Sequence, residues 1–238
     1  MSRKDTPLMK LALHEAGDGD RTVLLVHGVM SSSSTWRRVA PALVERGYRV
    51  LMPDLRGHGD SPHADEYTPE LLAADLVETV PAGVDLALAH SFGAPVLALA
   101  VAGLRPARVV YSDPAWKLGA TSVDEVREFA QATKSATAES IRQLCPRWLP
   151  EDIEAELAGY ARWDVRAIEW LQSDRDLIPA RAEVPSLVQG AGDHHLVPDE
   201  LAERLRARGF EVVYVPDTGH CIHRDDLDGF LKSLDGWL

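Results

Sequence analysis

Short apolar runs alternate along the chain with stretches whose apolar residues recur at helical spacing. The runs predict strands over residues 9–14, 22–26, 48–52, 84–89, 107–111, 186–189 and 211–215. The spaced stretches predict helices over residues 36–46, 68–79, 92–103 and 198–208. The central runs are apolar on both faces, which is typical of strands buried between two helical layers. We therefore expect an α/β fold, with a mainly parallel sheet and helices on both of its faces.

Residues 114–179 interrupt this alternation, because they contain no convincing strand and are helical in character throughout. We expect a core formed by residues 1–113 and 180–238, and a helical cap formed by residues 114–179. A cap inserted here would cover the carboxyl edge of the sheet, where open α/β sheets bind ligands. Each cap tryptophan either packs the cap onto the core or lines a largely apolar substrate pocket. The residues in question are Trp116, Trp148, Trp163 and Trp170.

The composition of the chain limits its possible binding partners and its expected cellular compartment. The chain has 238 residues, with 25 Lys and Arg against 37 Asp and Glu, and a net charge of −12. Such a chain repels phosphate backbones, so we expect no nucleic-acid partner. The most apolar segment, residues 94–104, is shorter than the roughly 20 residues needed to span a bilayer. With two cysteines and no apolar leader, we expect a cytoplasmic protein without a membrane partner, monomeric by default.

The segment AHSFGA, residues 89–94, joins a predicted strand to a predicted helix. Small residues on both sides of Ser91 allow a tight turn that lifts the serine hydroxyl above the sheet. The usual pattern has glycine at the first small position, where this chain has Ala89. Serine is a weak nucleophile and needs a base to take its proton and an acid to orient that base. Ser91 is therefore the candidate nucleophile.

Two downstream segments supply candidates for the acid and the base. The segment GAGD, residues 190–193, follows a predicted strand and places Asp193 at the same edge of the sheet. His220 follows the last predicted strand and arrives at that edge too. The chain order Ser91, Asp193, His220 is the order expected of an α/β-hydrolase triad.

With these features the chain resembles the α/β-hydrolase superfamily over nearly its whole length, with residues 114–179 in the place of the family's cap. The segment HGVM, residues 27–30, resembles the turn that supplies one oxyanion-hole N–H group in that family. The resemblance implies that the backbone N–H groups of Val29 and Phe92 form the oxyanion hole. The segment DLRGHGDS, residues 54–61, resembles a family turn whose role is structural.

Other residues remain candidates for the same roles. Asp113 ends the strand before the cap and is the alternative acid. His223 is a second choice for the base, whereas His90 is expected to point away from the serine hydroxyl. His194 and His195 suggest a metal site, but adjacent residues of an extended chain point apart, and no other cluster has metal-ligand spacing. We therefore expect no metal and no cofactor.

These residues predict two-step acyl transfer. The expected substrate is a small, largely apolar carboxylic ester, thioester or lactone, which would form an acyl-enzyme on Ser91. A carbon–carbon bond hydrolase or a cofactor-free perhydrolase would use the same three side chains. A non-hydrolytic ligand-binding protein on this fold is a further alternative, because a fold alone does not determine a function.

Overall fold

The computed structural model describes residues 6–117, 122–168, 175–192 and 196–238. Within those residues, seven strands form one sheet in the order β1-β3-β2-β4-β5-β6-β7. Strand β1 is antiparallel to β3, and every other neighbouring pair is parallel. The strands are β1 (Leu13–Ala16), β2 (Arg21–Val26), β3 (Tyr48–Pro53), β4 (Leu86–His90), β5 (Val109–Ser112), β6 (Ser186–Ala191) and β7 (Glu211–Val215). The predicted α/β fold is confirmed.

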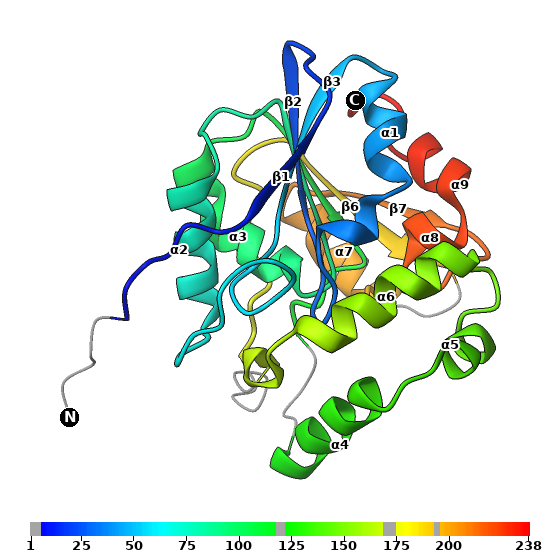
Figure 1. Ribbon diagram of the computed structural model, residues 1–238. Helices are drawn as coiled ribbons and strands as arrows, with labels where there is room; N and C mark the ends of the chain where they lie inside the picture. The colour runs from blue at the N-terminus through cyan, green and yellow to red at the C-terminus, as the bar shows by residue number, and fades with distance from the viewer. Residues whose placement is uncertain (1–5, 118–121, 169–174, 193–195) are drawn as a thin grey trace.

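Helices cover both faces of this sheet (Figure 1). On one face, α2 (Pro69–Thr79), α3 (Gly93–Leu104) and α7 (Asp199–Ala207) bury their apolar sides in one hydrophobic cluster. On the other, α1 (Val39–Val44), α8 (Ile222–Asp225) and α9 (Leu227–Lys232) pack into a second cluster. The short 3₁₀ helix η1 (Ser33–Trp36) precedes α1. Strands β2, β4 and β5 are apolar on both sides because they lie between these two clusters.

The first strand begins later than the apolar run of residues 9–14 predicts. The backbone N–H groups of Met9, Leu11 and Ala12 donate to side-chain oxygens, at 2.9 Å in each case. Those acceptors belong to α2 and to the turn after β3. The stretch before Leu13 therefore packs against that helix and that turn and does not pair with a strand of the sheet. Pairing with β3 starts only at Leu13.

Residues 114–179 lie between β5 and β6, and we call them the insertion. The described part holds α4 (Val123–Lys134), α5 (Ala138–Leu144) and α6 (Pro150–Arg162). Helix α6 runs below the carboxyl ends of the strands, and α4 and α5 lie farther out (Figure 1). At Gly159 this helix approaches the loop after β2 so closely that a Cβ atom would lie 2.6 Å from the carbonyl oxygen of Met30.

Two ion pairs hold α6 to the core, and in each of them the carboxylate is buried. Asp152 accepts a hydrogen bond from Arg37 at 2.7 Å, and Glu156 accepts one from Arg224 at 2.6 Å. Arg224 comes four residues after His220, so α6 is fastened to the segment that carries the candidate base.

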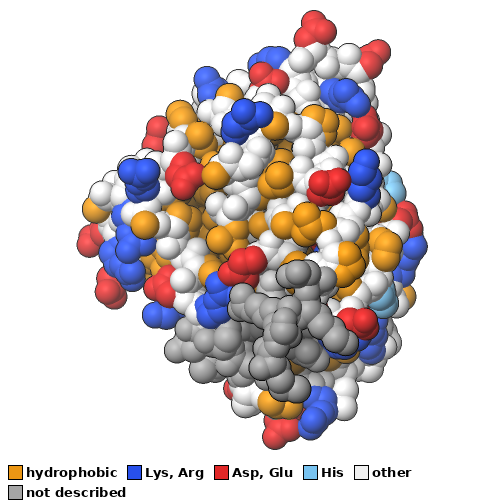
Figure 2. Space-filling model, turned by 90° about the vertical axis from the view of Figure 1, so that its left-hand side faces the viewer, with side chains coloured by type: hydrophobic (Ala, Val, Ile, Leu, Met, Phe, Trp, Pro, Cys, Tyr) orange, Lys and Arg blue, Asp and Glu red, His pale blue; other side chains and the backbone are white. Residues whose placement is uncertain are grey.

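Charged side chains are mixed on the surface formed by α2 and α3. Figure 2 shows this side, where Lys and Arg alternate with Asp and Glu and with scattered apolar side chains. Among the large apolar side chains of these two helices, Val77 is 41% exposed and Leu99 is 44% exposed. The negative net charge is therefore not gathered on this face. Among the helices of the described residues, none is long and apolar enough to cross a membrane.

A buried salt bridge fixes the turn after β3 to α2, and its loss is expected to be costly. Arg56 donates to both carboxylate oxygens of Asp75, at 2.6 and 2.9 Å, and neither side chain is exposed. We expect Asp75→Ala to lower the free energy of unfolding by about 3–5 kcal/mol, because the guanidinium group stays buried without its partner. Urea unfolding measures this loss. Glu15→Ala, which breaks the exposed pair with Arg49, is the control and is expected to cost less than about 1 kcal/mol. Equal losses in the two variants would contradict this account.

Candidate active site

The turn between β4 and α3 holds Ser91 in a strained conformation. Its φ of +52° lies in the left-handed region, which costs free energy for a residue with a side chain. The turn is fixed by a 3.0 Å hydrogen bond from the N–H of Ser91 to the carbonyl oxygen of Ser112 on β5. Gly93 must be small, since a Cβ atom there would lie 2.5 Å from the carbonyl oxygen of His27. The small residues around the serine therefore allow the close approach that the sequence predicts.

His220 lies between the side chains of Ser91 and Asp113. Its Nδ1 is 2.6 Å from Oδ2 of Asp113, and its Nε2 is 2.8 Å from Oγ of Ser91. A carboxylate only accepts, so Nδ1 carries the proton and Nε2 is left to accept the hydrogen bond of the serine hydroxyl. Asp113 is fully buried, and its other oxygen accepts the N–H of Ala191 at 3.4 Å. A continuous hydrogen-bonded chain thus joins carboxylate, imidazole and hydroxyl.

The carboxylate that contacts His220 is that of Asp113, the alternative candidate from the sequence. Asp193, the favoured candidate, lies outside the described residues, as do His194 and His195. Asp113 already occupies Nδ1 of His220, which is where the orienting acid must bind. It arrives there because β5 is the immediate neighbour of β4, with Ser112 in register with His90.

Two other histidines lie close to His220 but make different contacts. Nε2 of His90 donates to the backbone carbonyl of His220 at 2.9 Å, and the two rings lie 4.6 Å apart. Nε2 of His223 lies 2.9 Å from Oγ1 of Thr35. His90 thus supports the backbone of the residue that contacts the serine.

Cys221, the residue after His220, is a poor candidate for the nucleophile. Burial raises the pKa of its thiol, so the thiol stays protonated and reacts poorly.

The turn after β2 lies against the serine. A Cβ atom on Gly28 would lie 3.2 Å from Cβ of Ser91, so the backbone at Gly28 passes directly beside it. His27 holds this turn from both ring nitrogens: Nδ1 lies 2.7 Å from the carbonyl oxygen of Gly28, and Nε2 accepts the N–H of Leu55 at 2.9 Å. No local sequence pattern predicts the bond between His27 and Leu55, because the two residues are 28 positions apart.

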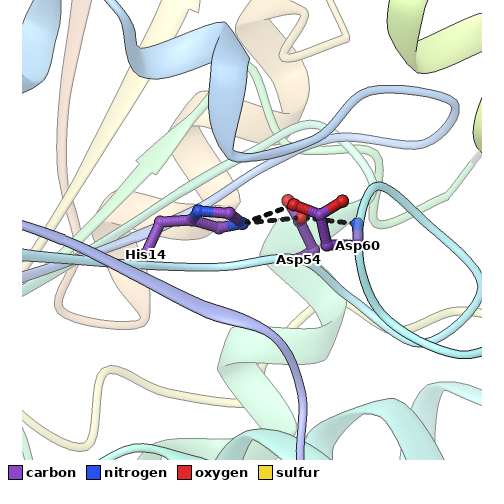
Figure 3. Close-up of side chains that lie close together, drawn as sticks. All are labelled: His14, Asp54 and Asp60. Carbon is purple, nitrogen blue, oxygen red and sulfur yellow. Dashed lines mark hydrogen bonds and ion pairs between the residues drawn. The ribbon is translucent and has the colours of Figure 1, made fainter.

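The turn after β3 is organised by Asp54. Its carboxylate accepts the backbone N–H groups of Ser33 at 2.6 Å and of Asp60 at 2.8 Å. Figure 3 shows His14 pointing at the same carboxylate, with Nε2 at 3.1 Å from Asp54 and 3.4 Å from Asp60. Among the described residues, these three form the group of His, Cys, Asp and Glu side chains spaced to hold a metal ion. Asp60 also pairs with Arg162 of α6, so both carboxylates already have protein partners.

Comparison with known proteins shows to which family the chain belongs. The profile of the alpha/beta hydrolase family matches residues 23–232. The chain belongs to the alpha/beta hydrolase family. The resemblance inferred from the sequence motifs is confirmed, and with it the expectation of an enzyme, since the related proteins are named as hydrolases, lipases and esterases.

Members of the family with different activities are similar to this chain. N-formylmaleamate deformylase of Pseudomonas putida is 30% identical over 255 residues, which are 93% of this chain and 90% of that protein. The sn-1-specific diacylglycerol lipase ABHD11 of Mus musculus is 27% identical over 258 residues, 93% of this chain and 83% of that protein. The solved structure of an esterase from Exiguobacterium antarcticum is similar to this chain with a TM-score of 0.77 and 17% sequence identity. The similar region covers 95% of this chain and 94% of the esterase chain. At this level of identity the similarity supports the fold alone.

The tryptophans of the insertion have different surroundings. Trp116 is buried against Tyr111 and Phe210 in the core, with ring centroids 5.0 and 6.1 Å away. The guanidinium group of Arg224 stacks over Trp148 at 4.4 Å. Trp163 packs against the turn after β2, in a cluster that includes Val29. Trp170 lies outside the described residues. Val29 also packs against the core cluster that contains Trp116, whereas Met30 of the same turn packs, among the described clusters, only with the Trp163 cluster.

A separate cavity of about 360 Å³ lies between α3 and the segment of residues 176–183. Its lining includes Leu99, Tyr111 and Phe210, and includes none of the three hydrogen-bonded side chains around Ser91. The cavity is therefore distinct from the candidate active site.

Buried histidines are expected to make the stability of the protein depend on pH. Burial lowers the pKa of His27, His90 and His223 below 6.5 and lowers the pKa of His58 to about 3. Each ring binds a proton more readily in the unfolded chain, so stability is greatest above about pH 6.5 and falls as the pH drops below it. The slope is expected to reach about 1.4 kcal/mol per pH unit for each histidine. Urea unfolding at pH 7.5, 6.5 and 5.5 measures this, and equal stability at all three values would contradict it.

Proposed function

We propose that this enzyme is a serine hydrolase that cleaves an uncharged carboxylic ester, thioester or lactone through an acyl-enzyme on Ser91. The observation that carries the proposal is His220, hydrogen-bonded through Nε2 to the hydroxyl of Ser91 and through Nδ1 to the carboxylate of Asp113. A weak nucleophile, a base within 2.8 Å and a buried acid behind that base are the parts that acyl transfer requires.

In the first step, Oγ of Ser91 attacks the substrate carbonyl carbon as Nε2 of His220 takes the hydroxyl proton. The carboxylate of Asp113 holds the ring in the tautomer that can accept this proton and stabilises the imidazolium ion that forms. His220 then gives the proton to the leaving oxygen or sulfur, and the acyl group remains on Ser91. A water molecule, deprotonated by the same nitrogen, attacks the acyl-enzyme. His220 then gives that proton to Oγ of Ser91 as the bond to the acyl group breaks, and the acid is released.

The negative oxygen of the tetrahedral intermediate needs donors beside Ser91. The N–H of Phe92, at the start of α3, and the N–H of Val29, in the turn against the serine, are the proposed donors. Removing one such donor typically costs about 3 kcal/mol of transition-state stabilisation. The side chain of His27 supports this assignment because it holds the turn after β2 in place from both ring nitrogens.

Amide cleavage is a second candidate, and one relative favours it. N-formylmaleamate deformylase is 30% identical and aligns with 93% of this chain. The same attack on a formyl amide would release an amine in place of an alcohol, after His220 protonates the nitrogen.

Rates on a matched set of substrates test the proposal. The set contains p-nitrophenyl esters of two to eight carbons, a thioester, a γ-lactone, an N-formyl amide and a vinylogous 1,5-diketone. We expect turnover of the esters or their thioester and lactone analogues, with the diketone inert. Turnover of the formyl amide alone would favour the second candidate. Turnover of the diketone alone would indicate a carbon–carbon bond hydrolase, and binding of the set without turnover would indicate a ligand-binding protein.

A further inference from the structure

His58 is a fully buried histidine beside the candidate active site that the proposed mechanism does not use. It lies in the turn after β3, with zero exposure. Its ring centroid lies 6.0 Å from that of Phe92, the residue after the nucleophile, and 5.2 Å from that of His27. The side chain therefore faces both turns that flank the serine.

The hydrogen bonds of His58 determine which of its nitrogens can bind a ligand. Nδ1 lies 3.0 Å from the carbonyl oxygen of Arg56, and a carbonyl only accepts, so Nδ1 carries the proton. Burial lowers the pKa of the ring to about 3, so the ring is neutral and Nε2 keeps an unshared electron pair. This buried Nε2 has no hydrogen-bond partner among the residues that the structure describes. It is an acceptor that lacks a donor.

Trp163 of the insertion supplies the complementary group. Its indole ring stacks on His58, with centroids 6.3 Å apart and planes 28° apart. Its Nε1–H is a donor, is buried, and also has no partner within the described part of the chain. The same ring packs in the cluster that includes Val29 and Met30, in the turn against Ser91. An unsatisfied acceptor and an unsatisfied donor thus lie on stacked rings next to the candidate oxyanion turn.

The order of the strands indicates which part of a substrate would reach these rings. Along the sheet the order is β3, β2, β4, β5, and the turns after these strands carry His58, Val29, Ser91 and Asp113 in turn. His220 joins Asp113 and must lie near the leaving group, because it protonates that group. His58 and Trp163 lie on the opposite side of Ser91, where the acyl part of the substrate remains.

We propose that Nε2 of His58 and Nε1–H of Trp163 form a polar subsite for the acyl group of the substrate. This subsite binds an acyl chain that carries an uncharged hydrogen-bond donor, either a hydroxyl or an amide. The inference rests on the proposed serine hydrolase function and narrows its substrate class. A hydroxyl or an amide can donate to Nε2 and accept from the indole at once. A carboxylate cannot donate, and a lone-pair nitrogen repels it.

Two pairs of isosteric esters test the subsite. p-Nitrophenyl 3-hydroxybutyrate and 3-methylbutyrate differ by a hydroxyl in place of a methyl group. p-Nitrophenyl N-acetylglycinate and 4-oxopentanoate differ by an N–H in place of a CH₂. In at least one pair, we expect kcat/KM of the wild type to favour the donor-bearing ester by about ten- to hundredfold, because the ester without a donor leaves Nε2 unpaired.

Variants assign that preference to the two rings. His58→Phe and Trp163→Phe keep an aromatic ring, and each is expected to reduce the preference to within about threefold while the apolar ester is still hydrolysed. Trp237→Phe is the matched control, because that residue lies near the amino end of β5, where its carbonyl accepts a hydrogen bond from Arg108. It should keep the wild-type preference. If one histidine or tryptophan variant fails to fold, the other variant and the wild-type ratios still decide the question.

The outcomes separate this inference from the function on which it rests. Hydrolysis that depends on Ser91 but shows no preference in either pair would overturn the subsite and leave the serine hydrolase standing. A preference that survives in both ring variants would overturn it as well. Hydrolysis that persists in Ser91→Ala would overturn the proposed function itself.

Discussion

Replacing Ser91 by alanine is expected to lower kcat on any hydrolysed ester by about 10⁵- to 10⁶-fold, because the proposed acyl-enzyme can no longer form. The residual rate would come from the oxyanion donors and from binding alone. Steady-state kinetics on the best p-nitrophenyl ester measure this loss, with thermal unfolding to check that the fold is intact.

A buried serine elsewhere in the sheet is the control. Ser186 begins β6 at the amino end of the strand, and its hydroxyl donates to the carbonyl oxygen of Val184 at 2.7 Å. Ser186→Ala is expected to leave kcat within about twofold of the wild-type value, since substitutions away from the site rarely alter transition-state binding. A folded Ser91→Ala enzyme with a rate near that of this control would rule out Ser91 as the nucleophile.

Asp113→Asn is expected to lower kcat about 10⁴-fold while the folded structure is retained. The asparagine side chain has the same shape, but its amide no longer favours the His220 tautomer that carries a proton on Nδ1. Without that tautomer Nε2 cannot accept the serine proton. The rate should also recover partly at high pH, where hydroxide can take the proton from Ser91 in the first step and attack the acyl-enzyme in the second.

Asp193→Asn is the matched control, and it decides between the two acids that the sequence offered. We expect it to change kcat less than about tenfold, since Nδ1 of His220 is already held by Asp113 at 2.6 Å. A large loss in Asp193→Asn together with a small loss in Asp113→Asn would reverse the assignment.

The central part of the fold could be predicted from the sequence because its signals are local. The strand that ends at His90, the turn at Ser91 and the helix that begins at Gly93 follow one another directly, and each has its own pattern of apolar or small residues. The N-cap of α2 is equally local: Thr68 accepts the N–H of Leu71 at 3.2 Å, three residues away.

The contact between Asp113 and His220 depends on which strands are neighbours, and no local sequence pattern contains that information. Asp113 reaches His220 because β5 lies next to β4, although 107 residues separate the two side chains. The glycine-rich turn before Asp193 is the stronger local signal, whereas Asp113 follows a short strand without such a turn. The start of β1 differs from the prediction for a similar reason. The backbone N–H groups of Met9, Leu11 and Ala12 donate to side chains of α2 and of the turn after β3, which are distant in sequence.

The pairing of His58 with Trp163 was also beyond the reach of the sequence. The two rings come from the turn after β3 and from the insertion, and their contact depends on how α6 is fastened to the core. Asp152 and Glu156 fasten that helix through Arg37 and Arg224. The sequence predicts that residues 114–179 are helical in character but does not say which loops of the core those helices cover.

The central claim is that Ser91 is the nucleophile activated by His220, and covalent labelling tests it most directly. The enzyme is treated with a fluorophosphonate probe, digested, and the modified residue is located by mass spectrometry. The account predicts one adduct, on Oγ of Ser91, formed rapidly in the wild type, slowly in His220→Ala and not at all in Ser91→Ala. Rapid labelling of Ser91→Ala, or an adduct on another residue of the wild type, would contradict it.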